Sequence, residues 1–114
     1  MEIDRIRPGE WNCRACIHGG LVFLSGTVAD DKTLPMKEQT AQVLAKIDAV
    51  LNEAGTDKTR ILSATVYLAD IGRKEEMNEA WMAWVDADNL PTRTAVGVAL
   101  TPGTLVEITV SAAR

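Results

Sequence analysis

The sequence has few of the residues that most often bind metals. It contains two cysteines and one histidine in 114 residues. A structural zinc site needs four ligands, which these three side chains cannot supply. His18 stands beside Gly19 and Gly20, where it is expected to be a turn residue. We therefore expect no bound metal.

Clusters of basic residues are also absent. Twelve Lys and Arg are scattered among sixteen Asp and Glu, which gives a formal net charge of -4 and a pI of about 4.9. Because proteins bind phosphate backbones chiefly through clustered Lys and Arg, this composition argues against a nucleic-acid partner.

No long hydrophobic run interrupts the chain. The apolar segment "LVFL" is far shorter than the roughly 20 residues of a membrane span, and the first ten residues are too charged for a signal peptide. We expect a cytoplasmic protein without a membrane partner, in which Cys13 and Cys16 are reduced thiols.

Familiar cofactor and nucleophile motifs are missing as well. "GGLVFLSG" lacks the spacing of a dinucleotide or phosphate loop, and Ser25 lacks the setting of a nucleophile elbow. Cys13 and Cys16 lie three apart in an expected strand, so their side chains should point to opposite faces, and redox CxxC pairs normally begin a helix. We expect both cysteines to be chemically idle and no cofactor to be bound.

The composition is that of one soluble globular domain covering residues 1–114. Its 46% hydrophobic and 25% charged residues are ordinary, and the length suffices for one core. Strands are expected in residues 2–8, 11–20 and 21–29, with a hairpin turn at Gly19 and Gly20.

Two helices are expected after these strands. The first begins near Pro35 and ends at Gly55. Its apolar stripe is Met36, Val43, Leu44, Ile47, Val50, Leu51 and Ala54. The second starts at about Arg73, with Glu75 and Glu76 in its first turn. Its apolar stripe is Met77, Ala80, Trp81, Trp84 and Val85.

The remaining apolar segments complete the predicted fold. Residues 60–71 are apolar on both sides, which is typical of a central strand, and residues 93–99 and 105–112 read as a final hairpin around Pro102 and Gly103. The order β-β-β-α-β-α-β-β predicts an α+β domain with two helices on one face of a single sheet. The other face needs a cover, which predicts self-association.

Two charges stand out in that last apolar segment, Arg93 and Glu107. Burying an unpaired charge is costly, so they lie either on a solvated face or in a site. A two-residue loop would place Val98 opposite Glu107 and Arg93 on the other face. A three-residue loop with Gly103 in a bulge would place Gly97 opposite Glu107 and Arg93 on the same face. The pattern leaves both geometries open.

Several stretches together resemble a known family. They are "LVFLSGTVADD", "EQTAQVLAKIDAVLNEAGTDKTRILSATVYLADI", "MNEAWMAWV", "PTRTAVGV" and "LVEITVSAA". The chain is similar, over residues 3–113, to the RidA/YjgF family of small enamine/imine deaminases, and within it to the YoaB-like branch. The resemblance implies a chorismate-mutase-like fold and a homotrimer with active sites between subunits.

The resemblance also implies a function and a site. It implies hydrolysis of enamines or 2-imino acids to 2-keto acids and ammonia without a cofactor, with Arg93 holding the substrate carboxylate and Glu107 activating water. Further positions matching the family's site are Ser25, Gly26, Asn78, Trp11 and Asn12. Three positions depart from the usual residues: Asn12 replaces Tyr, Thr27 replaces Gln and Ala95 replaces Cys. A trimeric binding or regulatory module for small carboxylates or protein partners is the alternative function.

Overall fold

A single mixed sheet organises residues 2–114, the part of the chain that the computed structural model describes. The strands are β1 (Ile3–Ile6), β2 (Ala15–His18), β3 (Leu21–Leu24), β4 (Thr27–Val28), β5 (Ile61–Leu68), β6 (Thr92–Gly97) and β7 (Val106–Ala113). The helices are α1 (Met36–Glu53) and α2 (Lys74–Trp84). The short 3-10 turn η1 (Lys58–Arg60) leads into β5, and η2 (Ile71–Arg73) leads into α2. The predicted α+β class is confirmed.

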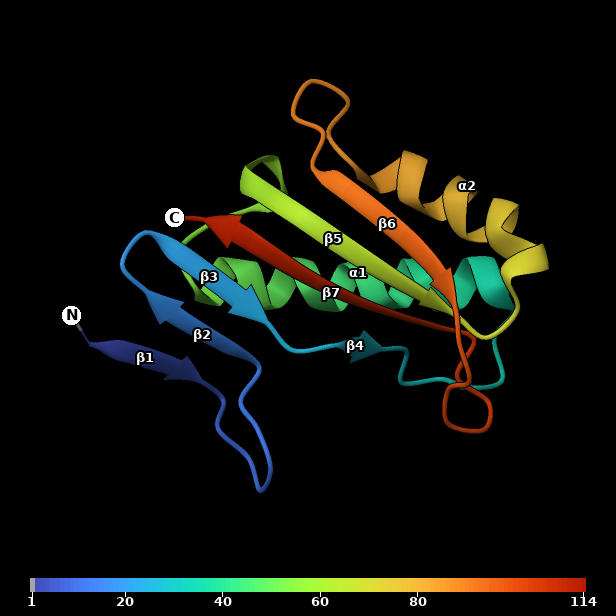
Figure 1. Cartoon of the computed structure of the whole chain (residues 1–114), viewed down its shortest axis with the longest axis horizontal. Helices are drawn as coiled ribbons and strands as arrows, with labels where there is room; N and C mark the ends of the chain where they lie inside the picture. Colours follow the sequence, from blue (N-terminus) through green and yellow to red (C-terminus); the bar gives the residue numbers. More distant parts are fainter. Residues whose placement is uncertain (1) are drawn as a thin grey trace.

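The strands follow the spatial order β1-β2-β3-β7-β5-β6, and β4 continues the sheet beside β7. Within residues 2–114, only β5 and β6 run parallel, and α2 makes the crossover between them. Both helices lie on one side of the sheet and pack against each other (Figure 1). The predicted hairpin at Gly19 and Gly20 is confirmed, since His18 pairs with Leu21.

The predicted final hairpin is wrong. Strand β5 lies between β6 and β7 and pairs with both. A strand with apolar residues on both of its faces is typical of the interior of a sheet, where another strand lies along each edge. Here β6 and β7 are those two neighbours. The Pro-Gly turn does form, with Gly103 at a φ of +84°, but its loop crosses over the end of β5. The Gln39 side chain holds this loop by donating to the Gly103 carbonyl at 2.9 Å.

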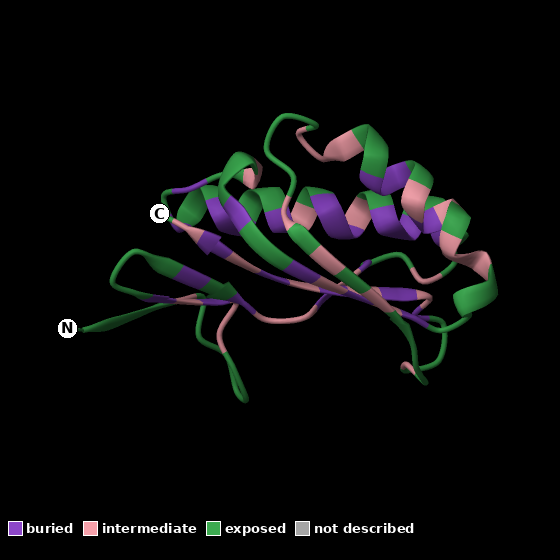
Figure 2. Ribbon diagram, turned by 45° about the horizontal axis from the view of Figure 1, so that its top comes forward, coloured by how far each residue is buried: buried purple, intermediate pink, exposed green. Residues whose placement is uncertain are grey.

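The core lies between the helices and one face of the sheet (Figure 2). Alternate residues of β7 face it, and these are Val106, Ile108, Val110 and Ala112. The predicted stripe of α1 is wholly buried, and Met77, Ala80 and Trp81 of α2 are buried as well. Each Val, Leu, Ile or Met side chain among them stabilises the fold by about 1.5–3 kcal/mol. No helix within residues 2–114 is long and apolar enough to cross a membrane.

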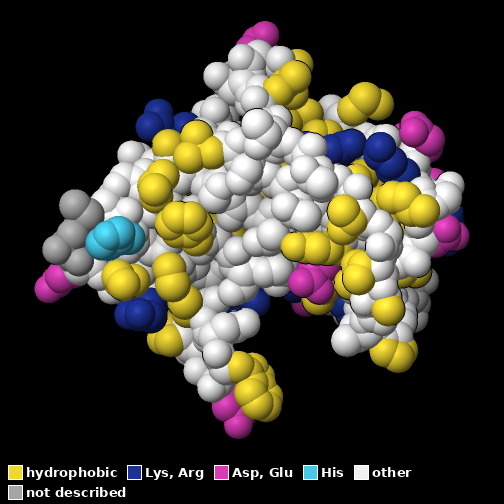
Figure 3. Space-filling view, viewed as in Figure 1, with side chains coloured by type: hydrophobic (Ala, Val, Ile, Leu, Met, Phe, Trp, Pro, Cys, Tyr) yellow, Lys and Arg dark blue, Asp and Glu magenta, His cyan; other side chains and the backbone are white. Residues whose placement is uncertain are grey.

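The other face of the sheet carries no helix and exposes large apolar side chains. Leu21, Phe23 and Val96 are 43%, 49% and 36% exposed. Figure 3 shows hydrophobic side chains gathered on this face. An apolar surface of this kind is typical of a protein–protein interface.

Candidate active site

Glu107 lies at the centre of the sheet face that has no helix. It occupies β7, where Tyr67 of β5 is its partner on one side and Val28 of β4 is its partner on the other. Its side chain is half-buried and borders a hollow of about 380 Å³. The lining residues are Gly26, Tyr67, Val98, Ala99, Leu100, Glu107 and Thr109.

The Ser25–Gly26 segment makes room for this carboxylate. Strand β3 ends at Leu24 and β4 starts at Thr27, so Ser25 and Gly26 form a break between two strands that both pair with β7. The Ser25 hydroxyl donates to the Cys13 carbonyl at 2.6 Å, and Arg14 donates to the Gly26 carbonyl at 3.3 Å. A side chain at Gly26 would overlap the Oε2 atom of Glu107 and lie 3.0 Å from its Cδ atom.

Gly26→Ala is therefore expected to displace the Glu107 carboxylate. If Glu107 transfers protons, as the family resemblance implies, this displacement should lower turnover at least tenfold. The overlap involves the end of a flexible side chain, so the fold should survive. Steady-state kinetics and circular dichroism measure the two effects. Gly20→Ala is the matched control, because a side chain there meets nothing within 4 Å. Equal turnover in the two variants would show that Gly26 does not position Glu107.

Arg93 lies on the opposite face of the sheet, near its edge. Its guanidinium stacks 5.3 Å from the centre of the Trp81 ring and donates to the Asn78 Oδ1 atom at 2.8 Å. A weaker contact of 3.6 Å reaches the Met77 Sδ atom. No carboxylate in residues 2–114 lies within 4.0 Å of Arg93. Its remaining N–H groups are directed donors suited to an external carboxylate.

The two charged residues do not meet within one chain. Arg93 pairs with Ala64 of β5, whose side chain is buried under the helices, whereas Glu107 pairs with Tyr67. Ala64 and Tyr67 are three apart in one strand, so their side chains point to opposite faces. Both hairpin geometries considered from the sequence are therefore wrong, because Tyr67 of β5, and neither Val98 nor Gly97, lies opposite Glu107.

Trp11 and Asn12 belong to the loop between β1 and β2. Trp11 is 88% exposed, and the loop borders a hollow of about 440 Å³ that Ser25 also lines. Ser25 lines this hollow, whereas the next residue, Gly26, lines the separate hollow at Glu107. The structure thus divides the predicted site residues among three places. Trp11, Asn12 and Ser25 line one hollow, Gly26 and Glu107 line another, and Arg93 and Asn78 form a pair beside α2.

The expectation that Cys13 and Cys16 point apart is wrong. Their Sγ atoms lie 3.4 Å from each other. Strand β2 starts only at Ala15, so the alternation of a strand does not extend back to Cys13. No group of three or more possible metal ligands occurs within residues 2–114.

Tyr67 was missed from the sequence as a site residue. It faces Glu107 across the β5–β7 ladder and lines the same hollow. The signal was present in the alternation of β5, where Ala64, Val66 and Leu68 are buried and Tyr67 falls on the other face. Assigning Glu107 to a hairpin hid this neighbour.

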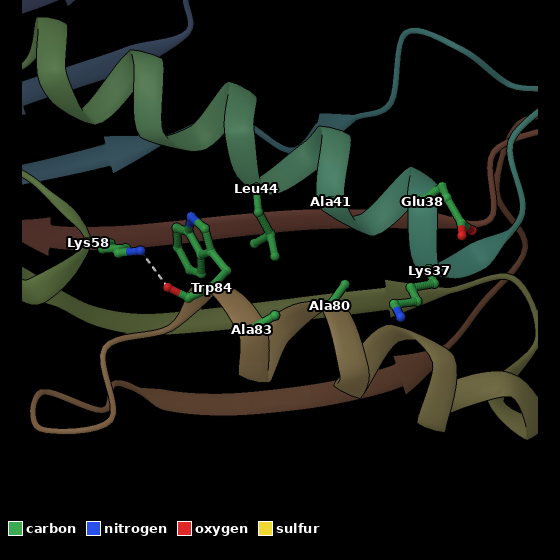
Figure 4. Close-up of a pocket in the computed structure, with 8 residues that line it drawn as sticks. All are labelled: Lys37, Glu38, Ala41, Leu44, Lys58, Ala80, Ala83 and Trp84. Carbon is green, nitrogen blue, oxygen red and sulfur yellow. Dashed lines mark hydrogen bonds between the residues drawn. The ribbon is translucent and has the colours of Figure 1, made fainter.

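A further hollow of about 320 Å³ lies between α1 and α2 (Figure 4). None of the predicted site residues lines it. Trp84 closes one end, and its indole donates to the Asp48 Oδ2 atom at 2.9 Å, while Lys58 donates to the Trp84 carbonyl at 2.6 Å. These contacts tie the end of α2 to α1 and η1, which gives this region a structural role.

Comparison with known proteins gives consistent matches over nearly the whole chain. The family model described as Endoribonuclease L-PSP matches residues 3–114. A RutC family protein of Haemophilus ducreyi is 44% identical over 112 residues, covering 97% of this chain and 96% of that protein. The RutC family protein YoaB of Escherichia coli is 43% identical over 98 residues, covering 85% of each.

A solved structure agrees with these matches. A YjgF-family protein from Neisseria meningitidis has a TM-score of 0.97 and 41% identity, over 100% of this chain and 96% of that one. The predicted resemblance to the YjgF family and its YoaB-like branch is confirmed.

Proposed function

Because the chain belongs to the L-PSP family, which includes the RutC and YjgF proteins, we propose that it hydrolyses reactive 2-imino acids to 2-keto acids and ammonia. The observation that carries this proposal is the presence of two charged groups with complementary tasks, neither of which forms an ion pair within residues 2–114. Arg93 offers free donors for a carboxylate, and Glu107 borders a hollow large enough for a small substrate and water.

Because an imine is already electrophilic, the protein needs only to bind the substrate and to activate a water molecule. Arg93 holds the substrate carboxylate, and Glu107 takes a proton from a water molecule that adds to the imine carbon. The same carboxyl group then returns this proton to the nitrogen, which gives a carbinolamine. Glu107 next takes the proton of the new hydroxyl group and passes it to the nitrogen, so that the carbonyl forms as the C–N bond breaks and ammonia leaves. An enamine reaches the same path after tautomerising to its imine. The proposal assigns no step to a metal or cofactor.

The active site in this proposal is shared between two subunits of a homotrimer. Arg93 and Glu107 leave opposite faces of the sheet in one chain, so a single site needs them from different chains. The uncovered apolar face around Phe23 and Val96 supplies a surface for that contact. A closed ring with three-fold symmetry would repeat the same Arg93–Glu107 cleft at each interface.

Light scattering at micromolar concentration is expected to give three times the chain mass of 12.4 kDa. Replacing Phe23, which is exposed on the uncovered face, with Glu should shift the protein towards monomer and abolish turnover together. Met82→Glu, at an exposed position of α2, is the control and should remain a trimer. A monomer with full activity would contradict a site between subunits.

The departures at Thr27 and Ala95 fit a mechanism that does not use them. Thr27 is 2% exposed, and its hydroxyl donates to the Ser25 carbonyl at 3.2 Å, so it stabilises the strand break. Ala95 has no reactive group. The proposed chemistry consequently rests on Arg93 and Glu107 alone, with Trp11 and Asn12 at the rim shaping the accepted side chain.

Ammonia release from a panel of imines tests this function directly. The imines are generated in the assay from apolar, polar and acidic amino acids by an amino-acid oxidase with catalase. We expect faster imine decay with the protein than without it for at least one side-chain class. No acceleration for any imine, together with keto-acid binding that depends on Arg93, would favour the binding-module alternative. The name of the family model also points to RNA cleavage, against which the net charge of -4 argues.

A further inference from the structure

The thiols of Cys13 and Cys16 form a pair that the proposed reaction does not use. Their Sγ atoms are 3.4 Å apart, and both residues are half-buried at the rim of the hollow beside Trp11. The chain folds back after Pro8 and Gly9, and the Arg14 amide donates to the Ile6 carbonyl at 2.8 Å. This return of the loop brings Cys13 next to the start of β2.

We propose that Cys13 and Cys16 are a modification site, a dithiol that closes reversibly to an intramolecular disulfide by exchange with low-molecular-weight disulfides. An S–S bond is about 2.05 Å long, so the sulfurs must approach by about 1.35 Å from their 3.4 Å separation. Cys16 is fixed in β2, where Arg5 and Phe23 are its neighbours on the two sides. Cys13 lies outside the ladder, so the loop can supply the movement.

The hydrogen bonds indicate which sulfur attacks first. Cys13 donates to the Ala15 carbonyl at 3.3 Å, which leaves its sulfur to accept from the Cys16 thiol. The hydrogen bond to Cys13 is the main cause that raises the pKa of Cys16, and burial adds to it. Cys16, whose pKa is raised and which is fixed in β2, is therefore the less reactive of the two thiols, and we assign the first attack to Cys13 in the loop.

The exchange needs one external disulfide for each pair of thiols. The Cys13 thiolate attacks one sulfur of glutathione disulfide, forms a mixed disulfide and releases one glutathione thiolate. Cys16 loses its proton and attacks the Cys13 sulfur, which releases the second glutathione. The two cysteines are oxidised by two electrons and lose two protons, and the glutathione disulfide is reduced to two thiols.

Closing this bond has a consequence for the neighbouring loop. The Cys13 carbonyl accepts the hydrogen bond of the Ser25 hydroxyl, and the Gly9 amide donates to the Asn12 carbonyl at 2.7 Å. Movement of Cys13 thus acts on both ends of the segment that carries Trp11. The environment of the exposed Trp11 indole should change with the state of the thiols, whatever reaction the protein catalyses.

The test equilibrates the full chain in glutathione buffers of increasing disulfide content, followed by acid quenching, alkylation and mass spectrometry. We expect both thiols to disappear together as an intramolecular disulfide, and Trp11 fluorescence, isolated in a Trp81→Phe, Trp84→Phe background, to change in parallel. Cys16→Ser should instead accumulate a glutathione adduct on Cys13, and it should react several-fold faster than Cys13→Ser.

The alternatives are distinguishable in the same spectra. Three results would each overturn the proposal. They are two thiols that stay free in glutathione disulfide alone, stable glutathione adducts on both cysteines, and disulfides between chains. Equal reaction rates of the two single-serine variants would contradict the role given to Cys13. The double Cys→Ser variant is the baseline for fluorescence, and a redox-dependent change that persisted in it could not arise from these thiols.

Discussion

Glu107→Gln is expected to lower the rate of imine hydrolysis on the order of a hundredfold or more, the usual contribution of a general base. The amide keeps the shape of the side chain in the hollow beside Gly26 and Tyr67 but cannot take a proton from water. Single-turnover kinetics measure the loss. Binding of the keto-acid product, measured by calorimetry, should change little, because the proposal gives Glu107 no contact with the substrate carboxylate.

Asp4→Asn is the matched control for this variant, since Asp4 is an exposed carboxylate in strand β1. It loses the same charge without touching the hollow and should keep the wild-type rate. If Glu107 were only a solvated charge on the sheet, both variants would hydrolyse imines at the wild-type rate. Wild-type turnover in Glu107→Gln would remove the residue from the mechanism.

Arg93→Ala is expected to abolish hydrolysis and to weaken keto-acid binding by roughly 1.5–3 kcal/mol, about 10- to 150-fold, the scale of a charged hydrogen bond. Arg93→Lys should recover little, because an ammonium cannot make the two-pronged contact of a guanidinium. The fold should survive, since the residue is only half-buried near the edge of the sheet. Calorimetry and steady-state kinetics give the two values.

Arg60→Ala serves as the control for that loss of positive charge, because Arg60 is exposed in η1. Its keto-acid affinity should equal that of the wild type. A second variant, Asn78→Ala, removes the 2.8 Å contact that orients the guanidinium and should have an intermediate effect on affinity. Unchanged keto-acid affinity in Arg93→Ala would show that another group holds the carboxylate.

The sequence predicted the elements of this fold better than their pairing. Periodicity located α1, α2 and the central strand β5, because burial repeats with the geometry of each element. Pairing depends on which strands compete for the same edge. The turn around Gly103 favoured a local hairpin, yet β5 needed a partner on each side and separated β6 from β7. A local turn signal could not reveal that competition.

The same limit applies to the candidate site. The family resemblance identified Arg93, Glu107, Gly26 and Asn78 as site residues. The structure shows that Asn78 contacts Arg93 and that Gly26 leaves room for the Glu107 carboxylate. The Tyr67 neighbour required the β5–β7 register, and the approach of Cys13 to Cys16 required the path of an irregular loop. Neither follows from spacing along the chain.

The central claim is that each active site takes Arg93 from one chain and Glu107 from another, and mixing inactive variants tests it most directly. Chains with Arg93→Ala and chains with Glu107→Gln are unfolded together in equal amounts, refolded and assayed. A site between an unmodified Arg93 and an unmodified Glu107 then forms at about a quarter of the interfaces by random assortment. We expect ammonia release to return to about that fraction of the wild-type rate. Chains with Glu107→Gln refolded with the double variant should stay inactive. Mixed trimers, detected by native mass spectrometry, that show no recovered activity would contradict a site shared between subunits.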